Sequence, residues 1–233
     1  MRERTRRIVA GMILIGVACG VLFVQTASYD IPPPPPPGDA ASISRQSAAA
    51  MLETLQVKGR SARTHYDRAQ FGDGWQRQGI CDTRNIILAR DLVDEVVNSD
   101  CRVLSGELHD PYSGQTISFV RGASTSDAVQ IDHVVALGDA WQKGASQWPR
   151  ARRIAFANDP LELLAVDGQA NQRKGAGDAA TWLPPNKSFR CQYIARQIAI
   201  KARYQLWVTA AEKQAMQRVL GKCPGQTAPM AES

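Results

Sequence analysis

The chain has 233 residues, of which 44% are hydrophobic and 21% are charged. This composition predicts a globular domain with appendages and excludes a wholly disordered polymer. The formal net charge is +6, but residues 1–7 contribute +3 of it, which leaves +3 for the rest of the chain. A balance this mild is compatible with a polyanionic partner and does not demand one.

The N-terminus has the pattern of an export signal. Four arginines and one glutamate in residues 1–7 precede an apolar stretch of 17 residues, from Ile8 to Val24. This length lies between a long signal peptide and a short membrane anchor. We expect residues 1–28 to be one or the other, so the protein is exported and is either secreted or anchored to the outer face of the cytoplasmic membrane.

A proline-rich linker follows over residues 29–40. Six consecutive prolines, Pro32 to Pro37, favour an extended polyproline II spacer, and Gly38 ends the run. We expect the folded domain to span residues 41–223 and residues 224–233 to form a flexible tail.

Within the domain, hydrophobic spacing predicts helices and strands in alternation. Helical patterns cover residues 42–57 and 82–98, and a turn at 110–114 leads into a strand over 116–120. A β-prone run at 129–137 precedes a helix-like stretch that carries two tryptophans. A strand is expected at 161–166, a helix opening at Asn171, and helices at 191–206 and 210–220. Thr209 and Glu212 have capping-box spacing at the start of the last helix. The fold class is therefore α+β.

Four cysteines lie outside the apolar stretch: Cys81, Cys101, Cys191 and Cys223. An even number in an exported domain predicts two disulfides. Of the three possible pairings we favour Cys81 with Cys101 and Cys191 with Cys223, which closes the shorter loops. A zinc site is the alternative, and it is weakened because no two of these cysteines have C-x₂₋₄-C spacing.

Histidine is scarce, which narrows the choice of a general base. The chain has only His65, His109 and His133, and the first two are expected to be structural. His133 follows Asp132 in the β-prone run. Aspartate and asparagine oxygens suit Mg²⁺ or Mn²⁺, and a histidine suits activation of water. The alternative is an aspartate that only orients a structural histidine.

Several motifs that follow one another along the chain are more specific for a protein family than the Asp-His pair alone. They are residues 130–137, which include Asp132-His133, then 139–145, 156–160, 171–175 and 180–185, with shorter pieces upstream at 66–68, 81–84 and 110–114. Together they resemble the HNH endonuclease superfamily, and most closely the C-terminal nuclease domain of GmrSD-type restriction enzymes. The resemblance covers roughly Tyr66 to Cys223.

The resemblance implies a ββα-metal core, in which two strands and a helix hold one divalent cation, within a mainly helical domain. It assigns Asp132 and Asn171 as metal ligands, His133 as the general base and Asn158 as the residue that orients the histidine. Asparagine rather than histidine at position 171 favours Mg²⁺ over zinc, with Mn²⁺ as a second choice.

The spacing also implies an insertion. Thirty-eight residues separate His133 from Asn171, so the stretch from Ala136 to Arg153 must lie between the two strands. Trp141 and Trp148 in it are expected to pack in the core rather than to stack on bases.

Basic residues near these motifs are candidates for substrate binding. Lys174 lies about one helical turn after Asn171 and is expected to contact phosphate, the alternative being a solvated surface lysine. The arginines expected to bind nucleic acid are Arg150, Arg152, Arg153 and Arg173, the alternative being an exposed charged helix end. Arg84 could approach the site, but nothing in the sequence places it there.

The predicted function is metal-dependent hydrolysis of phosphodiester bonds in nucleic acid, with DNA as the expected substrate and no protein partner implied. The alternative is an exported module that keeps the HNH fold and binds nucleic acid or the cell envelope without catalysis. Calorimetry separates the two, because a pure binding module has no need of a saturable divalent-ion site.

Overall fold

The computed structural model describes residues 47–122 and 125–229. The expected signal or anchor, the proline-rich linker and residues 230–233 of the tail lie outside the described residues. None of the helices in the described part is both long enough and apolar enough to cross a bilayer.

Helices and strands alternate, as the sequence predicts for an α+β domain. The first half contains α2 (Ala48–Thr54), η1 (Arg68–Phe71), β1 (Arg77–Gln78), β2 (Cys81–Asp82), α3 (Thr83–Asp91), β3 (Val93–Val97), β4 (Val103–His109) and β5 (Thr116–Val120). The second half contains η2 (Ser126–Ala128), β6 (Val129–His133), α4 (Leu137–Gln142), η3 (Ala145–Gln147), α5 (Arg150–Ala157), β7 (Leu163–Asp167), α6 (Gly168–Lys174), η4 (Lys187–Phe189), α7 (Arg190–Tyr204) and α8 (Ala210–Leu220).

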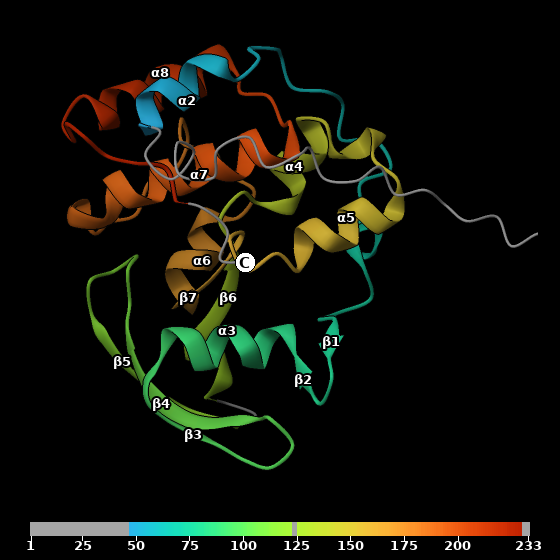
Figure 1. Ribbon diagram of the computed structural model, residues 1–233, viewed down its shortest axis with the longest axis vertical. Coiled ribbons are helices and arrows are strands. Elements are labelled where there is room, and N and C mark those ends of the chain that lie inside the picture. The colour runs from blue at the N-terminus through green and yellow to red at the C-terminus, as the bar shows by residue number, and fades with distance from the viewer. Residues whose placement is uncertain (1–46, 123–124, 230–233) are drawn as a thin grey trace, which may run out of the picture. The chain divides into compact units, whose positions relative to one another are not determined.

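The strands form three small antiparallel sheets. β3, β4 and β5 make one, β1 and β2 make a second, and β6 and β7 make a third. In the β6–β7 pair, His133 lies opposite Leu163 and Gln130 lies opposite Val166. Figure 1 shows α2, α7 and α8 at one end of the domain, the β3–β4–β5 sheet at the other, and β6, β7 and α6 between them.

The β6–β7 pair contains the expected insertion. α4 and α5 lie between the two strands in sequence, and α6 begins directly after β7. Asp167 caps α6 by accepting a hydrogen bond from the backbone N–H of Ala170. The residues at 167–168 therefore start a helix, which begins three residues before the expected position and places Asn171 in its middle.

Only the first half of the helix predicted at residues 82–98 is present. The pattern at 82–98 predicts a single helix, but α3 ends at Asp91 and Val93 to Val97 form strand β3. β3 pairs with β4 through irregular register, and Asp94 has a φ of 50°. The valines have helix-like spacing by coincidence, and their β-branched side chains favour the extended strand.

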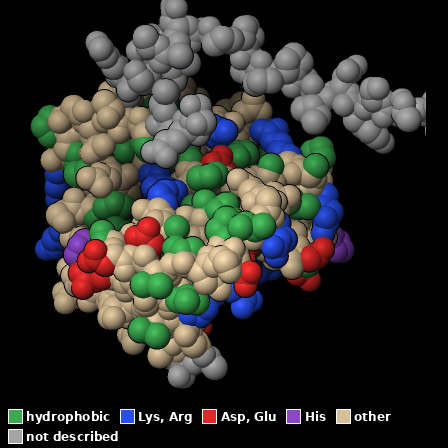
Figure 2. Space-filling view, turned by 60° about the horizontal axis from the view of Figure 1, so that its bottom comes forward, with side chains coloured by type: hydrophobic (Ala, Val, Ile, Leu, Met, Phe, Trp, Pro, Cys, Tyr) green, Lys and Arg blue, Asp and Glu red, His purple; other side chains and the backbone are tan. Residues whose placement is uncertain are grey.

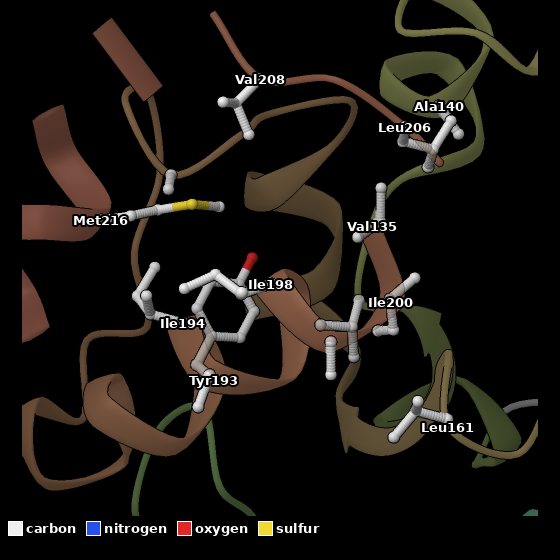
Figure 3. Close-up of a cluster of buried hydrophobic side chains, with 14 of the residues drawn as sticks. Val135, Ala140, Leu161, Tyr193, Ile194, Ile198, Ile200, Leu206, Val208 and Met216 are labelled. Carbon is white, nitrogen blue, oxygen red and sulfur yellow. The ribbon is translucent and has the colours of Figure 1, made fainter. Parts of the chain in front are cut away.

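Hydrophobic side chains gather in two clusters. The larger cluster joins α2, α4, α5, α7 and α8, and Figure 3 shows Tyr193, Ile194 and Ile198 of α7 at its centre. Trp141 and Trp148 belong to this cluster and are 7% and 9% exposed, so the expectation that they pack in the core is confirmed.

The smaller cluster fixes the orientation of β6. Ile87 and Leu88 of α3 pack against Val129 and Ile131 of β6, together with residues of β4, β5 and β7. Because successive side chains of a strand point to opposite faces, Gln130 and Asp132 are directed away from this cluster. The hydrophobic face of β6 thus sets where its polar residues lie.

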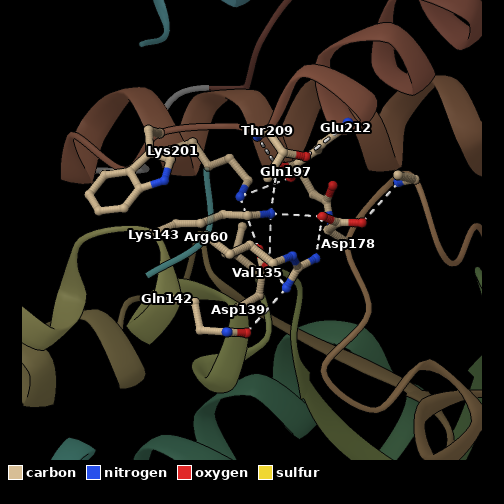
Figure 4. Close-up of polar contacts among 12 residues, drawn as sticks. Arg60, Val135, Asp139, Gln142, Lys143, Asp178, Gln197, Lys201, Thr209 and Glu212 are labelled. Atoms are coloured by element: carbon tan, nitrogen blue, oxygen red, sulfur yellow. Dashed lines mark hydrogen bonds and ion pairs between the residues drawn. The ribbon is translucent and has the colours of Figure 1, made fainter. Parts of the chain in front are cut away.

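A buried ion network ties the helices together (Figure 4). The ammonium group of Lys143 lies 2.7 Å from Asp139, 2.8 Å from Asp178 and 2.5 Å from Glu212. Lys201 lies 3.1 Å from Asp139 and 2.9 Å from Glu212. Each buried charge therefore has partners of the opposite sign, without which its burial would be costly.

Both disulfides have the pairing expected from the sequence. Cys81 is bonded to Cys101 and Cys191 to Cys223, with Cα–Cα distances of 5.1 and 6.0 Å. The first fixes the start of α3, and the second joins the start of α7 to the segment after α8. On the surface, Figure 2 shows acidic and basic side chains intermixed over one face.

Candidate active site

A cavity of about 600 Å³ brings together residues that are far apart in the sequence. Asp132 and His133 at the end of β6 line it, and Asn171 of α6 lines it from another direction. Asn158 lines an adjoining hollow of about 350 Å³, which His133 also borders. His133 therefore borders both hollows.

Asp132 is held by two donors. The carboxylate accepts a hydrogen bond of 2.9 Å from the ammonium of Lys174 and one of 2.5 Å from the hydroxyl of Tyr112. Burial, followed by the charge of Asp132, raises the pKa of Tyr112 well above its ordinary value, so the phenol keeps its proton and donates it. The two donors therefore hold the Asp132 carboxylate in a fixed orientation.

Lys174 contacts Asp132 and His133 within the protein, where a contact with substrate phosphate was expected. Its side chain is fully buried, and Nζ donates to the backbone carbonyl of His133 at 2.7 Å as well as to Asp132. A lysine in this position orients the carboxylate from behind. The expected direct contact with a substrate phosphate finds no support in this position.

The imidazole of His133 is fixed on one edge and on one face. Nε2 lies 3.0 Å from the carbonyl oxygen of Ala157, and the indole of Trp75 stacks on the ring at 5.7 Å between centroids and 8° between planes. A carbonyl only accepts, so Nε2 carries the hydrogen and Nδ1 keeps the lone pair. Burial, followed by the charge of Arg68, lowers the pKa of His133 to about 3.

Asn158 holds in place the backbone next to Ala157, whose carbonyl contacts His133. It follows α5, where its Oδ1 accepts from the N–H of Gln76 at 2.9 Å and its Nδ2 donates to the carbonyl of Ile154 at 3.0 Å. These bonds fix the loop that begins beside Ala157, whose carbonyl holds His133. The position suits the orienting role expected for Asn158.

The donor groups fit a hard divalent cation. The side-chain nitrogen of Asn171 donates to Oε1 of Gln130 at 3.0 Å, which leaves the amide oxygen available. The other available ligand is the Asp132 carboxylate, whose oxygens each carry a second lone pair. The described residues contain no cluster of three or more metal-binding side chains. Mg²⁺ is commonly held by one or two carboxylates and keeps several of its water ligands, so Asp132 and Asn171 are the residues that would hold it.

The four arginines expected to bind nucleic acid lie outside this cavity. Arg150 pairs with Asp73 at 3.1 Å, and Arg152 donates to the carbonyl of Tyr204 at 2.8 Å.

Arg153 is buried and donates to the backbone oxygens of Gln70 and Trp148. Arg173 is 58% exposed and lies beside Asp167. Arg153 in particular has a structural position, because its guanidinium is used within the protein.

Other arginines line the cavity instead. They are Arg63, Arg68 and Arg84, and Arg68 also borders the adjoining hollow. Arg63 lies outside the helices and strands and Arg68 begins the short helix η1, and no hydrophobic period marks either position. Arg84 lies three residues after Cys81, and the predicted disulfide between Cys81 and Cys101 indicated that this segment is held in place.

Comparison with known proteins identifies the family of the chain. Residues 82–219 match the family described as GmrSD restriction endonucleases, C-terminal domain. The match covers more than half of the chain, and the protein belongs to this family. It is also 37% identical over 182 residues to an uncharacterized secreted protein of Arthroderma benhamiae, covering 77% of this chain and 86% of that relative.

Proposed function

We propose that the protein is a divalent-metal-dependent endonuclease of the HNH type, which hydrolyses phosphodiester bonds in nucleic acid, with DNA as its substrate. The observation that carries the proposal is the meeting of Asp132, His133 and Asn171 at one cavity in a chain of this family. In this proposal β6, β7 and α6 form the ββα-metal core.

His133 is the general base of the proposed reaction. Its Nδ1 has the lone pair, since Nε2 is committed to Ala157. A neutral imidazole can take a proton from the water that attacks phosphorus. Trp75 and the Ala157 carbonyl hold the ring in place during this transfer.

Asp132 and Asn171 are the residues that would hold the cation. A bound Mg²⁺ or Mn²⁺ would polarise the scissile phosphate and stabilise charge on the leaving oxygen. Lys174 and Tyr112 position the Asp132 carboxylate for this task, and Gln130 positions the Asn171 amide. Pre-positioned ligands of this kind need no rearrangement when the substrate enters.

We further propose that the protein works outside the cell. The basic and apolar start of the chain has the pattern of an export signal. Two disulfides require an oxidising compartment to persist. The relative of Arthroderma benhamiae carries the word secreted in its name.

The test is a cleavage assay with the purified protein, plasmid DNA and RNA, in Mg²⁺, Mn²⁺ or EDTA. We expect divalent-dependent cleavage of DNA that His133→Ala abolishes without unfolding the protein. His109→Ala is the matched control, because this exposed histidine lies away from the cavity. Undiminished cleavage by His133→Ala would refute the assignment, and cleavage in EDTA would refute the need for a metal.

A further inference from the structure

Arg84 is a charged residue of the cavity wall that the proposed chemistry does not use. It lies in the first turn of α3 and shares the cavity with Asp132, His133 and Asn171. Its Nη1 atom is buried and has no hydrogen-bond partner among the described residues. Buried donors in folded proteins are nearly always paired, so an unpaired one calls for an explanation.

The charges around Arg84 make its position less favourable still. Burial lowers its pKa and the neighbouring cation Arg121 lowers it further, while the charges of Asp82 and Asp127 raise it by a smaller amount. The guanidinium of Arg121 has its own acceptors, the carbonyl of Val103 and the side chain of Asn85. The repulsion between the two cations therefore lacks a direct counter-ion at Arg84.

The backbone beneath Arg84 is tightly fixed. Asp82 caps α3 by accepting from both the backbone and the side chain of Asn85. Thr83 donates through its N–H and its hydroxyl to the carbonyl of Gln76, and Cys81 is bonded to Cys101. An unpaired cation on an anchored turn is pre-organised for an anion that comes from outside.

We propose that Arg84 binds a phosphate group of the nucleic-acid strand that occupies the cavity. The inference rests on the proposed function and adds a substrate-binding residue to it. The planar guanidinium matches two phosphate oxygens at once and is the usual choice for such recognition. Arg63 and Arg68 line the same cavity, so a strand bound there would meet more than one cation.

The test measures binding without hydrolysis. A fluorescein-labelled duplex DNA is titrated in EDTA with the wild-type protein, Arg84→Met, Arg84→Lys and Arg102→Met, and anisotropy is recorded at several salt concentrations. Arg102 is the matched control, because it is exposed and follows Cys101, yet does not line the cavity. We expect Arg84→Met to bind roughly tenfold more weakly and to reduce the salt slope by about one. Arg102→Met should bind as the wild type does.

A stability measurement separates this role from a structural one. Arg84→Met removes the unpaired donor and the repulsion from Arg121, so its unfolding midpoint should equal or exceed that of the wild type. Arg84→Lys keeps the charge, folds with the smallest change, and should still lose affinity several-fold because the fork is lost. This second variant decides the matter if Arg84→Met fails to fold.

The possible results separate the proposed role of Arg84 from the proposed nuclease function. If the wild type cleaves and binds DNA while both Arg84 variants bind equally well, Arg84 is not a phosphate ligand and the nuclease assignment stands. If the wild type neither binds nor cleaves nucleic acid, both proposals are overturned. A loss of affinity in the Arg84 variants with an unchanged Arg102→Met supports the inference.

Discussion

The ammonium of Lys174 on α6 lies 2.9 Å from Oδ1 of Asp132 on β6, and the lysine side chain is fully buried. The pair joins the helix to the strand at the point where the proposed metal ligand stands. A buried lysine thus neutralises and orients the carboxylate.

This pair makes Lys174→Met a severe change. The substitution leaves the Asp132 charge buried without its counter-ion, which costs about 3–5 kcal/mol in comparable cases. Urea unfolding measures the loss, and the exposed Lys222→Met is the control. The double variant Asp132→Asn with Lys174→Met should recover part of the stability. If the double variant is as unstable as Lys174→Met alone, the buried charge is not the cause.

The two disulfides should differ in their effect on function and agree in their effect on stability. Their sequence separations are 20 and 32 residues, and loops of this size predict a loss of about 3 kcal/mol when either bond is removed. Replacing both Cys81 and Cys101 with serine should also weaken DNA binding, because the start of α3 carries Arg84. The Cys191–Cys223 double serine variant should bind normally once folded. Equal binding by both would show that the first disulfide does not position the cavity wall.

The buried network predicts sensitivity to acid. Burial alone would raise the pKa of Asp139 and of Asp178, but Lys201 and Lys143 outweigh it for Asp139, and Lys143 and Arg60 outweigh it for Asp178. Both pKa values are therefore lowered below 3.8. Since the unfolded chain takes up these protons first, the stabilisation is present above pH 3.8 and is lost as the pH falls below it.

Lys143→Met should accordingly raise the midpoint pH of acid unfolding, as followed by circular dichroism. Lys213→Met is the control, because Lys213 pairs with the exposed Glu53 and such pairs contribute little. An unchanged acid midpoint in Lys143→Met would contradict the prediction.

Glu162 predicts the opposite pH dependence. Its carboxyl group is fully buried and accepts from the N–H of Val135 at 3.2 Å. Burial raises its pKa well above 4.5, against the effect of the Val135 N–H. The folded state keeps this proton longer, so its contribution to stability is complete below pH 4.5 and declines as the pH rises.

Glu162→Gln removes this titration and should gain stability relative to the wild type as the pH rises above 4.5. Guanidinium unfolding at a series of pH values measures the difference. Glu162→Leu, which cannot accept from Val135, should be less stable at every pH. A constant difference between Glu162→Gln and the wild type would show that Glu162 is ionised in the folded protein.

The sequence predicted best what hydrophobic periodicity and capping determine. α7, α8 and β5 lie close to their expected bounds, and the capping box of Thr209 and Glu212 is present. The spacing between His133 and Asn171 also predicted the insertion correctly. Such features depend on neighbours in the sequence, and a single chain displays them directly.

Features that depend on tertiary contacts could not be predicted from the sequence. The exposed strand β3 has no inward face to produce alternation, so its valines resembled a helix. One-turn spacing placed Lys174 near Asn171, but only the packing of α6 on β6 decides that its ammonium meets Asp132. Arg63 reaches the cavity from an irregular segment and Arg68 from the start of η1, and no hydrophobic period distinguishes either from a surface arginine.

The insertion of α4 and α5 between β6 and β7 also governs when the protein becomes competent during folding. His133 pairs with Leu163 across the intervening helices, and this contact requires the closure of a long loop before it brings any gain. The site is therefore assembled only when the whole segment from β6 to α6 is present and folded.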